Sequence, residues 1–62
     1  MSRLLTLPEA AEMLRRPVNT LRHWRFAGTG PTSFRMGRRV MYREEDLIAW
    51  VEAQRQAEQV AA

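Results

Sequence analysis

Apolar residues near the beginning of the chain repeat with the spacing of an amphipathic helix. Positions i, i+3, i+4 and i+7 are occupied by Leu7, Ala10, Ala11 and Leu14. This spacing places them on one helical face, and the helix is expected to begin at Leu7 or Pro8. Thr6 and Glu9 stand at the two positions of a capping box. A short extended segment, Leu4–Thr6, is expected to precede this helix.

A second amphipathic helix is predicted from Val18 to about Phe26, with its end near Ala27. Leu21 and Trp24 fall on its inner side. Its outer side carries the residues Asn19, Arg22, His23 and Phe26. The turn before it, Arg15–Pro17, is tight because proline cannot continue the first helix. Two short helices joined by so tight a turn must cross steeply, which is the geometry of a helix-turn-helix.

A β-hairpin is predicted from two short strands, Phe34–Met36 and Val40–Tyr42. A three-residue loop, Gly37–Arg39, gathers the apolar side chains of both strands on one side of the hairpin. A two-residue turn would set Met36 against Arg39 and break this apolar face, so the longer loop is favoured. The basic side chains then lie at the hairpin tip or on its polar side: Arg35, Arg38 and Arg39.

A third helix is predicted to begin at the acidic residues Glu44–Asp46, which favour the positive end of a helix dipole. Its buried stripe is expected to be Leu47, Ile48, Trp50 and Val51. Beyond Val51 the stripe turns polar, so residues 1–62 are read as a single domain with a core at about 4–51 and a helix or tail at 52–62. Both tryptophans, Trp24 and Trp50, are assigned to the core. Phe26 has an outward angle, and it is expected to pack beneath the hairpin rather than to contact a thymine methyl group.

Charge is distributed unevenly along the 62 residues, whose net charge is +3. Eight of the ten arginines lie in the range 15–43, which contains no Asp or Glu, and all seven acidic residues lie in the flanks. Such segregation raises a positive potential over one part of a small protein, as expected of a surface that meets nucleic acid. No apolar run is long enough for a signal peptide or a membrane span. We therefore expect a cytoplasmic protein that does not contact a membrane.

Neither catalysis nor a bound cofactor is indicated. The chain has no cysteine, and His23 is its only histidine, with no carboxylate near it in the sequence. A catalytic dyad or a metal site is therefore not expected. Gly28 and Gly30 follow a helix rather than a strand, so they do not form a nucleotide-binding loop. The protein is predicted not to be an enzyme and to bind no metal or cofactor.

The segment Thr20–Trp24 resembles the Thr-Leu-Arg-aromatic-aromatic signature of the MerR-type winged helix-turn-helix. The wider pattern resembles the small excisionase (recombination directionality factor) branch of that superfamily, over Leu5-Thr6, Glu9-Ala10-Ala11, Gly30-Pro31, Phe34, Met36-Gly37-Arg38-Arg39-Val40, Tyr42-Arg43, Asp46-Leu47 and Trp50-Val51. This resemblance covers about residues 4–51. It implies a mainly α fold with a small β-hairpin: a winged helix-turn-helix with three helices and a two-stranded wing.

The resemblance implies double-stranded DNA as the partner, with the second helix in the major groove and the wing on the backbone or the adjacent minor groove. The residue types agree, since amide and guanidinium groups pair with base edges and arginines hold phosphates. For base edges we expect Asn19, Arg22 and His23. For phosphates we expect Arg15, Arg16, Thr20 and Arg25. For the wing we expect Arg35, Arg38 and Arg39.

Three functions remain open at this point. An excisionase in a bacterial host cell is expected to bind repeated sites cooperatively, to associate head to tail, to bend DNA and to direct an integrase toward excision. A small MerR-like transcriptional regulator is the alternative, although regulators of that type dimerise through a long coiled coil and this sequence ends before one. A protein-binding adaptor is the third, and the acid-free arginine stretch argues against it.

Overall fold

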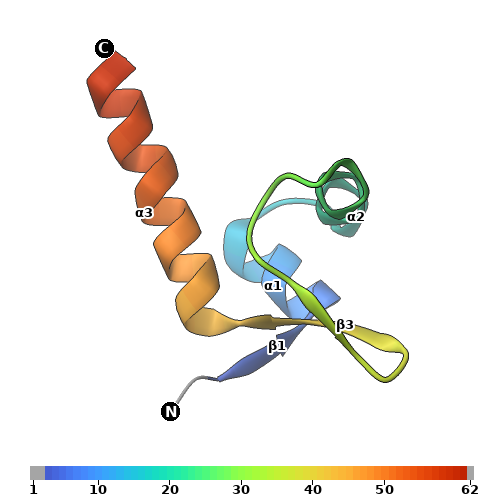
Figure 1. Ribbon diagram of the computed structural model, residues 1–62. Helices are drawn as coiled ribbons and strands as arrows, with labels where there is room; N and C mark the ends of the chain where they lie inside the picture. Colours follow the sequence, from blue (N-terminus) through green and yellow to red (C-terminus); the bar gives the residue numbers. More distant parts are fainter. Residues whose placement is uncertain (1–2, 62) are drawn as a thin grey trace.

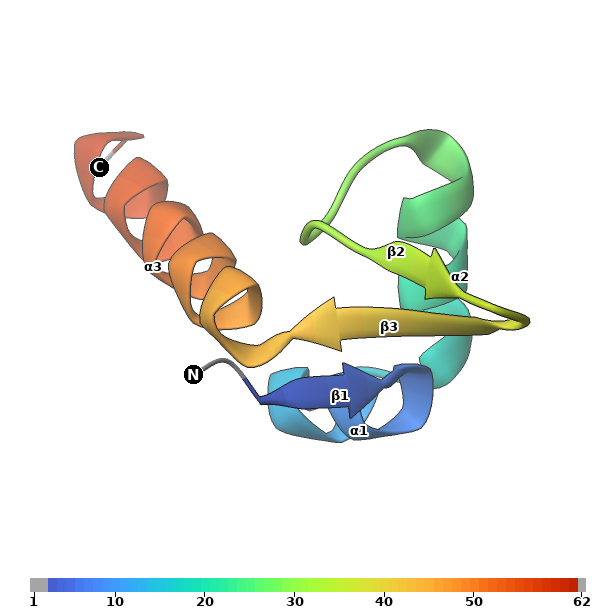
Figure 2. The same ribbon diagram turned by 60° about the horizontal axis from the view of Figure 1, so that its bottom comes forward.

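The computed structural model describes residues 3–61, and the side chains of residues 3–59. The elements in chain order are β1 (Leu4–Thr6), α1 (Leu7–Leu14), α2 (Val18–Ala27), β2 (Phe34–Met36), β3 (Arg39–Arg43) and α3 (Glu44–Ala61). The strands form one antiparallel sheet in the order β1-β3-β2. The helices α1 and α2 lie on one side of this sheet, and α3 extends away from its end (Figures 1 and 2). This arrangement confirms the mainly α fold with a hairpin wing and adds β1 to the sheet.

Both ends of α1 are closed by the local interactions that its sequence encodes. The backbone N–H of Thr6 donates to Glu9 Oε1 at 2.8 Å, and the N–H of Glu9 donates to Thr6 Oγ1 at 3.3 Å, which confirms the capping box. The hydrogen bond that the Thr6 backbone N–H donates, together with that of the Thr6 side chain, lowers the pKa of the Glu9 carboxyl. At the other end Arg15 adopts the left-handed conformation, with φ 55°, and the N–H of Arg16 donates to the Ala11 carbonyl at 3.0 Å. The helix therefore ends at Leu14, directly before the predicted turn Arg15–Pro17.

The bounds of α2 agree with the prediction, and its two ends are capped in different ways. Pro17 is the N-cap and offers no side-chain hydrogen bond. Gly28, with φ 78°, closes the other end, where the N–H of Thr29 donates to the Trp24 carbonyl at 2.8 Å. Backbone hydrogen bonds thus cap the C-terminal end of the helix, whereas its N-terminal end has no side-chain cap.

The hairpin between β2 and β3 has the two-residue loop, and the predicted three-residue loop is wrong. Met36 pairs with Arg39 and Phe34 with Met41. Gly37, with φ 65°, stands at the first loop position, the pattern of a type II′ turn whose twist matches that of the strands. On the other edge of β3, Leu5 of β1 pairs with Tyr42 and points into the core with it. Phe34, Met36 and Arg39 consequently lie on the outer face, and Arg35 lies on the face toward the helices.

A small core holds the elements together, and its members are Leu5, Ala10, Ala11, Leu21, Tyr42 and Leu47. Trp24 is half-buried and packs against this core, while its ring meets that of Trp50 at a centroid distance of 5.2 Å. The predicted stripe of α3 is wrong in part, because Ile48 and Val51 are 54% and 45% exposed. Only the first turns of α3 touch the body before the helix diverges from it (Figure 1). Phe26 does not pack beneath the wing either, since it is 84% exposed.

Gly30 is predicted to be required for packing on Trp24, whereas Gly28 is required only for its backbone conformation. Both have positive φ, but a Cβ at Gly30 would lie 2.9 Å from Trp24 Cβ, and a Cβ at Gly28 would meet nothing within 4 Å. Gly28→Ala should cost about 1 kcal/mol of unfolding free energy from left-handed strain. Gly30→Ala should cost about 2–3 kcal/mol, because the steric conflict adds to the same strain. Urea unfolding measures both, and equal losses would contradict the proposed contact.

The stability of the fold should fall at high pH because of Tyr42. Burial raises the pKa of its hydroxyl, while the hydrogen bond with Ser33 and the charge of Arg25 oppose part of the shift. The folded state binds the phenolic proton more tightly than the unfolded state, so this contribution is complete below the unfolded pKa of about 10 and is lost as pH rises through the folded pKa. Tyr42 is the only tyrosine, so phenolate absorbance follows this group alone. Native and urea-unfolded protein that titrate at the same pH would refute the prediction.

Candidate nucleic-acid interface

The outer face of α2 projects a continuous stripe of side chains away from the core. Asn19, Arg22, His23 and Phe26 are exposed, whereas Leu21 on the opposite side is only 1% exposed. Their spacing of i, i+3, i+4 and i+7 places them along two turns of one helical face. Thr20 is half-buried at the edge of this face, and its N–H donates to the Pro17 carbonyl at 3.0 Å. The core therefore holds α2 by one side and leaves amide, guanidinium and imidazole groups free on the other.

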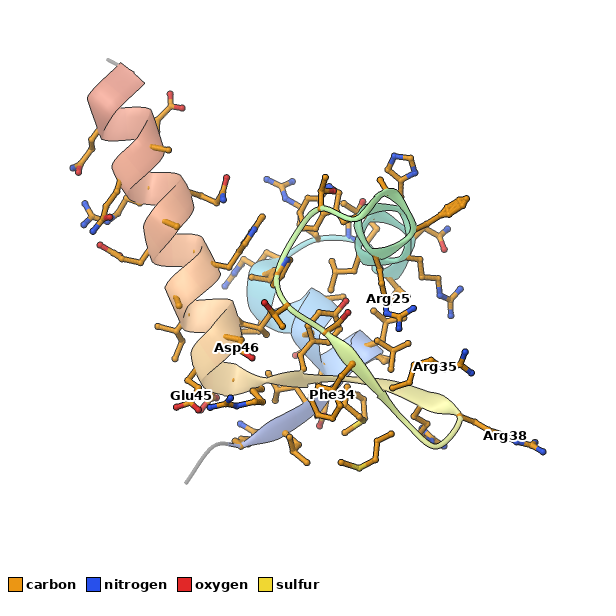
Figure 3. The ribbon with its side chains drawn as sticks, in the orientation of Figure 1. Arg25, Phe34, Arg35, Arg38, Glu45 and Asp46 are labelled. Atoms are coloured by element: carbon orange, nitrogen blue, oxygen red, sulfur yellow. The ribbon has the colours of Figure 1, made fainter. Side chains whose placement is uncertain are left out.

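Arg22 lies beside the wing rather than apart from it. Together with Arg38 and Arg39 it lines a hollow whose other walls are Thr6, Leu7, Pro8 and Val40. The first turn of α1 forms part of this hollow, and the N-terminal end of a helix carries a partial positive charge. Arg38 extends outward from the hairpin tip (Figure 3). The fold thus brings guanidinium groups of α2 and of the wing to one place that suits a phosphate oxygen.

Arg25 connects α2 to the wing through a hydrogen bond. Its Nε donates to Ser33 Oγ at 3.1 Å, and Ser33 is also hydrogen-bonded to the buried Tyr42. Figure 3 shows Arg35 between Arg25 and the hairpin tip. Arg25 is therefore oriented by the segment that leads into β2, and its remaining N–H groups are available for another partner.

Arg15 and Arg16 lie elsewhere on the molecule. They line a groove at the end of α1, whose apolar walls are Met13, Leu14, Trp24, Trp50 and Val51. Both arginines are exposed, and Arg15 bears the left-handed backbone conformation that ends α1. The expected DNA-contacting residues consequently form two groups, one over α2 and the wing and one at the turn between α1 and α2.

Ion pairs in the described part of the chain neutralise arginines at its flanks. Arg3 pairs with Glu44 at 3.7 Å, and the remaining pairs are Arg43 with Glu45 and Arg55 with Glu52. Among residues 3–59, no carboxylate pairs with Arg15, Arg16, Arg22, Arg25, Arg35, Arg38 or Arg39. The acidic residues at the start of α3 thus remove Arg43 from the positive surface and leave the others to create it.

One residue of this surface could not be expected from the sequence, and for another the predicted packing was wrong. Ser33 gave no signal, because a serine in a loop before a strand is ordinary, yet it orients Arg25. Phe26 belongs to the outer stripe of α2, where its exposure of 84% leaves it free of any packing role. Within the described residues, no His, Cys, Asp or Glu cluster could hold a metal ion. No helix there is long and apolar enough to cross a bilayer.

Comparison with known proteins identifies the domain. A family model described as "Helix-turn-helix domain" matches residues 4–55, a range that includes β1, α1, α2, the wing and the first two thirds of α3. No curated protein and no solved structure gives a match. The matched family consists of DNA-binding domains rather than enzymes. With α2 presented on a steep turn beside an arginine-rich wing, and with most of the sequence matched, this chain belongs to the helix-turn-helix domain family of DNA-binding proteins.

Proposed function

We propose that this protein is an excisionase that binds repeated DNA sites cooperatively, bends the DNA and directs an integrase toward excision. The observation that carries the proposal is the continuous set of arginines without carboxylate partners over α2 and the wing. The resemblance of residues 4–51 to the excisionase branch supports the finer assignment. The sites lie on DNA of a bacterial host cell.

Each part of the surface has its own role in this proposal. Asn19, Arg22 and His23 read base edges in the major groove, because they project from the centre of the outer face of α2. Arg15, Arg16, Thr20 and Arg25 hold phosphates and so fix the register of the helix on the duplex. Arg35, Arg38 and Arg39 bring the wing onto the adjacent backbone or into a narrow minor groove.

Specificity in this proposal comes from repetition. One module of this size buries about 600–1,000 Å² on DNA, which usually gives modest affinity. Several copies on neighbouring direct repeats would add their binding free energies, and each copy would add to the bend of the DNA. Direct repeats require head-to-tail contacts between different surfaces of successive copies. A regulator would instead use an inverted repeat and a two-fold dimer.

Substitutions of Arg22 and Arg38 should separate base reading from phosphate binding. We expect Arg22→Ala to weaken binding to the preferred site by about 1–3 kcal/mol and to relax the preference at one base pair. Arg38→Ala should weaken all sequences alike and reduce the slope of log K against log salt by about 1. Fluorescence anisotropy titrations on preferred and scrambled duplexes at several salt concentrations measure both effects. Because both side chains are exposed, urea unfolding of the variants should match that of the wild type.

Two outcomes of these titrations would change the assignment. If Arg22→Ala weakened binding equally on all sequences, Arg22 would be reassigned to the residues that contact phosphates. Its place in the hollow that it shares with Arg38 and Arg39 would agree with that role. A salt slope near zero for the wild type would refute DNA binding, since phosphate neutralisation contributes about −0.9 per contact.

Footprinting tests the excisionase role directly. Purified protein is titrated on DNA that flanks its own gene, at low and at physiological salt. Cooperative protection of closely spaced direct repeats beside an attachment-type site is the expected result. One protected inverted repeat over a promoter would assign the protein as a transcriptional regulator, and no protection at low salt would leave the adaptor reading.

A further inference from the structure

Phe26 is the most exposed large apolar side chain in the described part of the molecule. Its exposed fraction is 84%, whereas the other exposed large apolar residues, Leu4, Met13, Met36, Ile48 and Val51, range from 42% to 54%. Those five each keep about half of their surface covered by the fold. The phenyl group of Phe26 is nearly all in solvent, so intramolecular packing does not account for it.

The position of Phe26 places it with the base-reading residues. It follows Asn19 by seven residues, which is two helical turns, so both lie on the central line of the outer face of α2. Arg22 and His23 lie between them on the same face. A placement of α2 along the groove that brings Arg22 and His23 to base edges therefore brings the phenyl ring into the major groove beside them.

The major groove offers one apolar group to such a ring. Apart from aromatic C–H groups, the other groups at the base edges are hydrogen-bond donors or acceptors, while the C5-methyl group of thymine is apolar and makes contact with Phe side chains. We propose that Phe26 reads the C5-methyl group of a pyrimidine, in thymine or in 5-methylcytosine. This inference rests on the proposed DNA reading by α2 and adds a specificity-determining residue to it.

Helix geometry predicts where this pyrimidine lies. Phe26 follows Arg22 by four residues, an axial distance of about 6 Å at about 1.5 Å per residue. Successive base pairs are separated by about 3.4 Å. The methyl group should therefore lie about two base pairs from the base pair at which Arg22→Ala relaxes the preference.

Replacement of thymine by uracil removes the methyl group and leaves every hydrogen-bonding group of the base unchanged. The preferred site is first selected with wild-type protein from random duplexes, and each thymine in it is then replaced in turn by deoxyuridine. We expect one replacement, at the predicted distance, to weaken wild-type binding about fourfold, the effect of burying one methyl group. Phe26→Ala should bind the thymine and uracil duplexes equally, and Phe26→Leu should retain most of the discrimination.

The source of the methyl group is distinguished at the same position. With a C·G pair there, methylation of the cytosine at C5 should restore about fourfold in wild-type affinity and nothing in Phe26→Ala. A methylated cytosine that binds more tightly than thymine would identify 5-methylcytosine as the natural target. The matched control is Ile48→Ala, which removes an exposed apolar side chain from α3 and should leave the discrimination intact.

The outcomes separate this inference from the function on which it rests. Wild-type protein that selects a site but tolerates uracil at every thymine overturns the role of Phe26 alone. The same holds if Phe26→Ala retains the uracil penalty while its unfolding midpoint equals that of the wild type. Failure to select any sequence, with no salt-dependent binding, overturns the proposed function and this inference together.

Discussion

The packing around Trp24 holds α2 in place. Its ring lies against Trp50 of α3 at a centroid distance of 5.2 Å, and its Cβ lies beneath Gly30 so closely that any added Cβ there would come within 2.9 Å. One side chain thus joins α2 to α3 and to the loop that leads into the wing. Leu21 anchors α2 further, because it belongs to the same buried core cluster as Tyr42 and Leu47. Since a core this small leaves little surplus stability, the direction of α2 depends on these few contacts.

The same packing determines where positive charge accumulates. The acidic residues flank the core at the start of α3, where they favour the helix dipole and pair with Arg3 and Arg43. Their negative charge therefore acts on the side of the molecule where α3 begins. In the described structure no carboxylate pairs with the arginines of α2 or with three arginines of the wing, Arg35, Arg38 and Arg39. The left-handed backbone at Arg15, which costs an L-residue about 1–2 kcal/mol, lies at the tight turn that sets the crossing of α1 and α2.

The helices could be predicted because their signals are local. Thr6 and Glu9 close one end of α1, and Gly28 closes α2. The hairpin register could not be derived from the apolar pattern, because the grouping of four apolar residues on one face favoured a longer loop. The actual register follows from the positive φ of Gly37 and from the pairing of Leu5 with Tyr42, a contact between distant segments. The outward stripe of α2 was predictable for the same local reason as the helix, whereas the position of Arg22 beside the wing depends on how the helices cross.

In the proposed function, DNA binding and stability depend on opposite faces of α2, and two residues at the border of these faces contribute to both. The outer stripe contributes nothing to the core, so a residue as apolar as Phe26 can stand there without a structural penalty beyond its exposure. Arg25 and Thr20 lie at the border: Arg25 is bonded to Ser33, and Thr20 is half-buried. In the proposed function, changes at the centre of the stripe therefore alter which sequence is read while the fold is preserved. Changes at its border act on folding and on the proposed binding together, because Arg25 is bonded to the segment that leads into the wing.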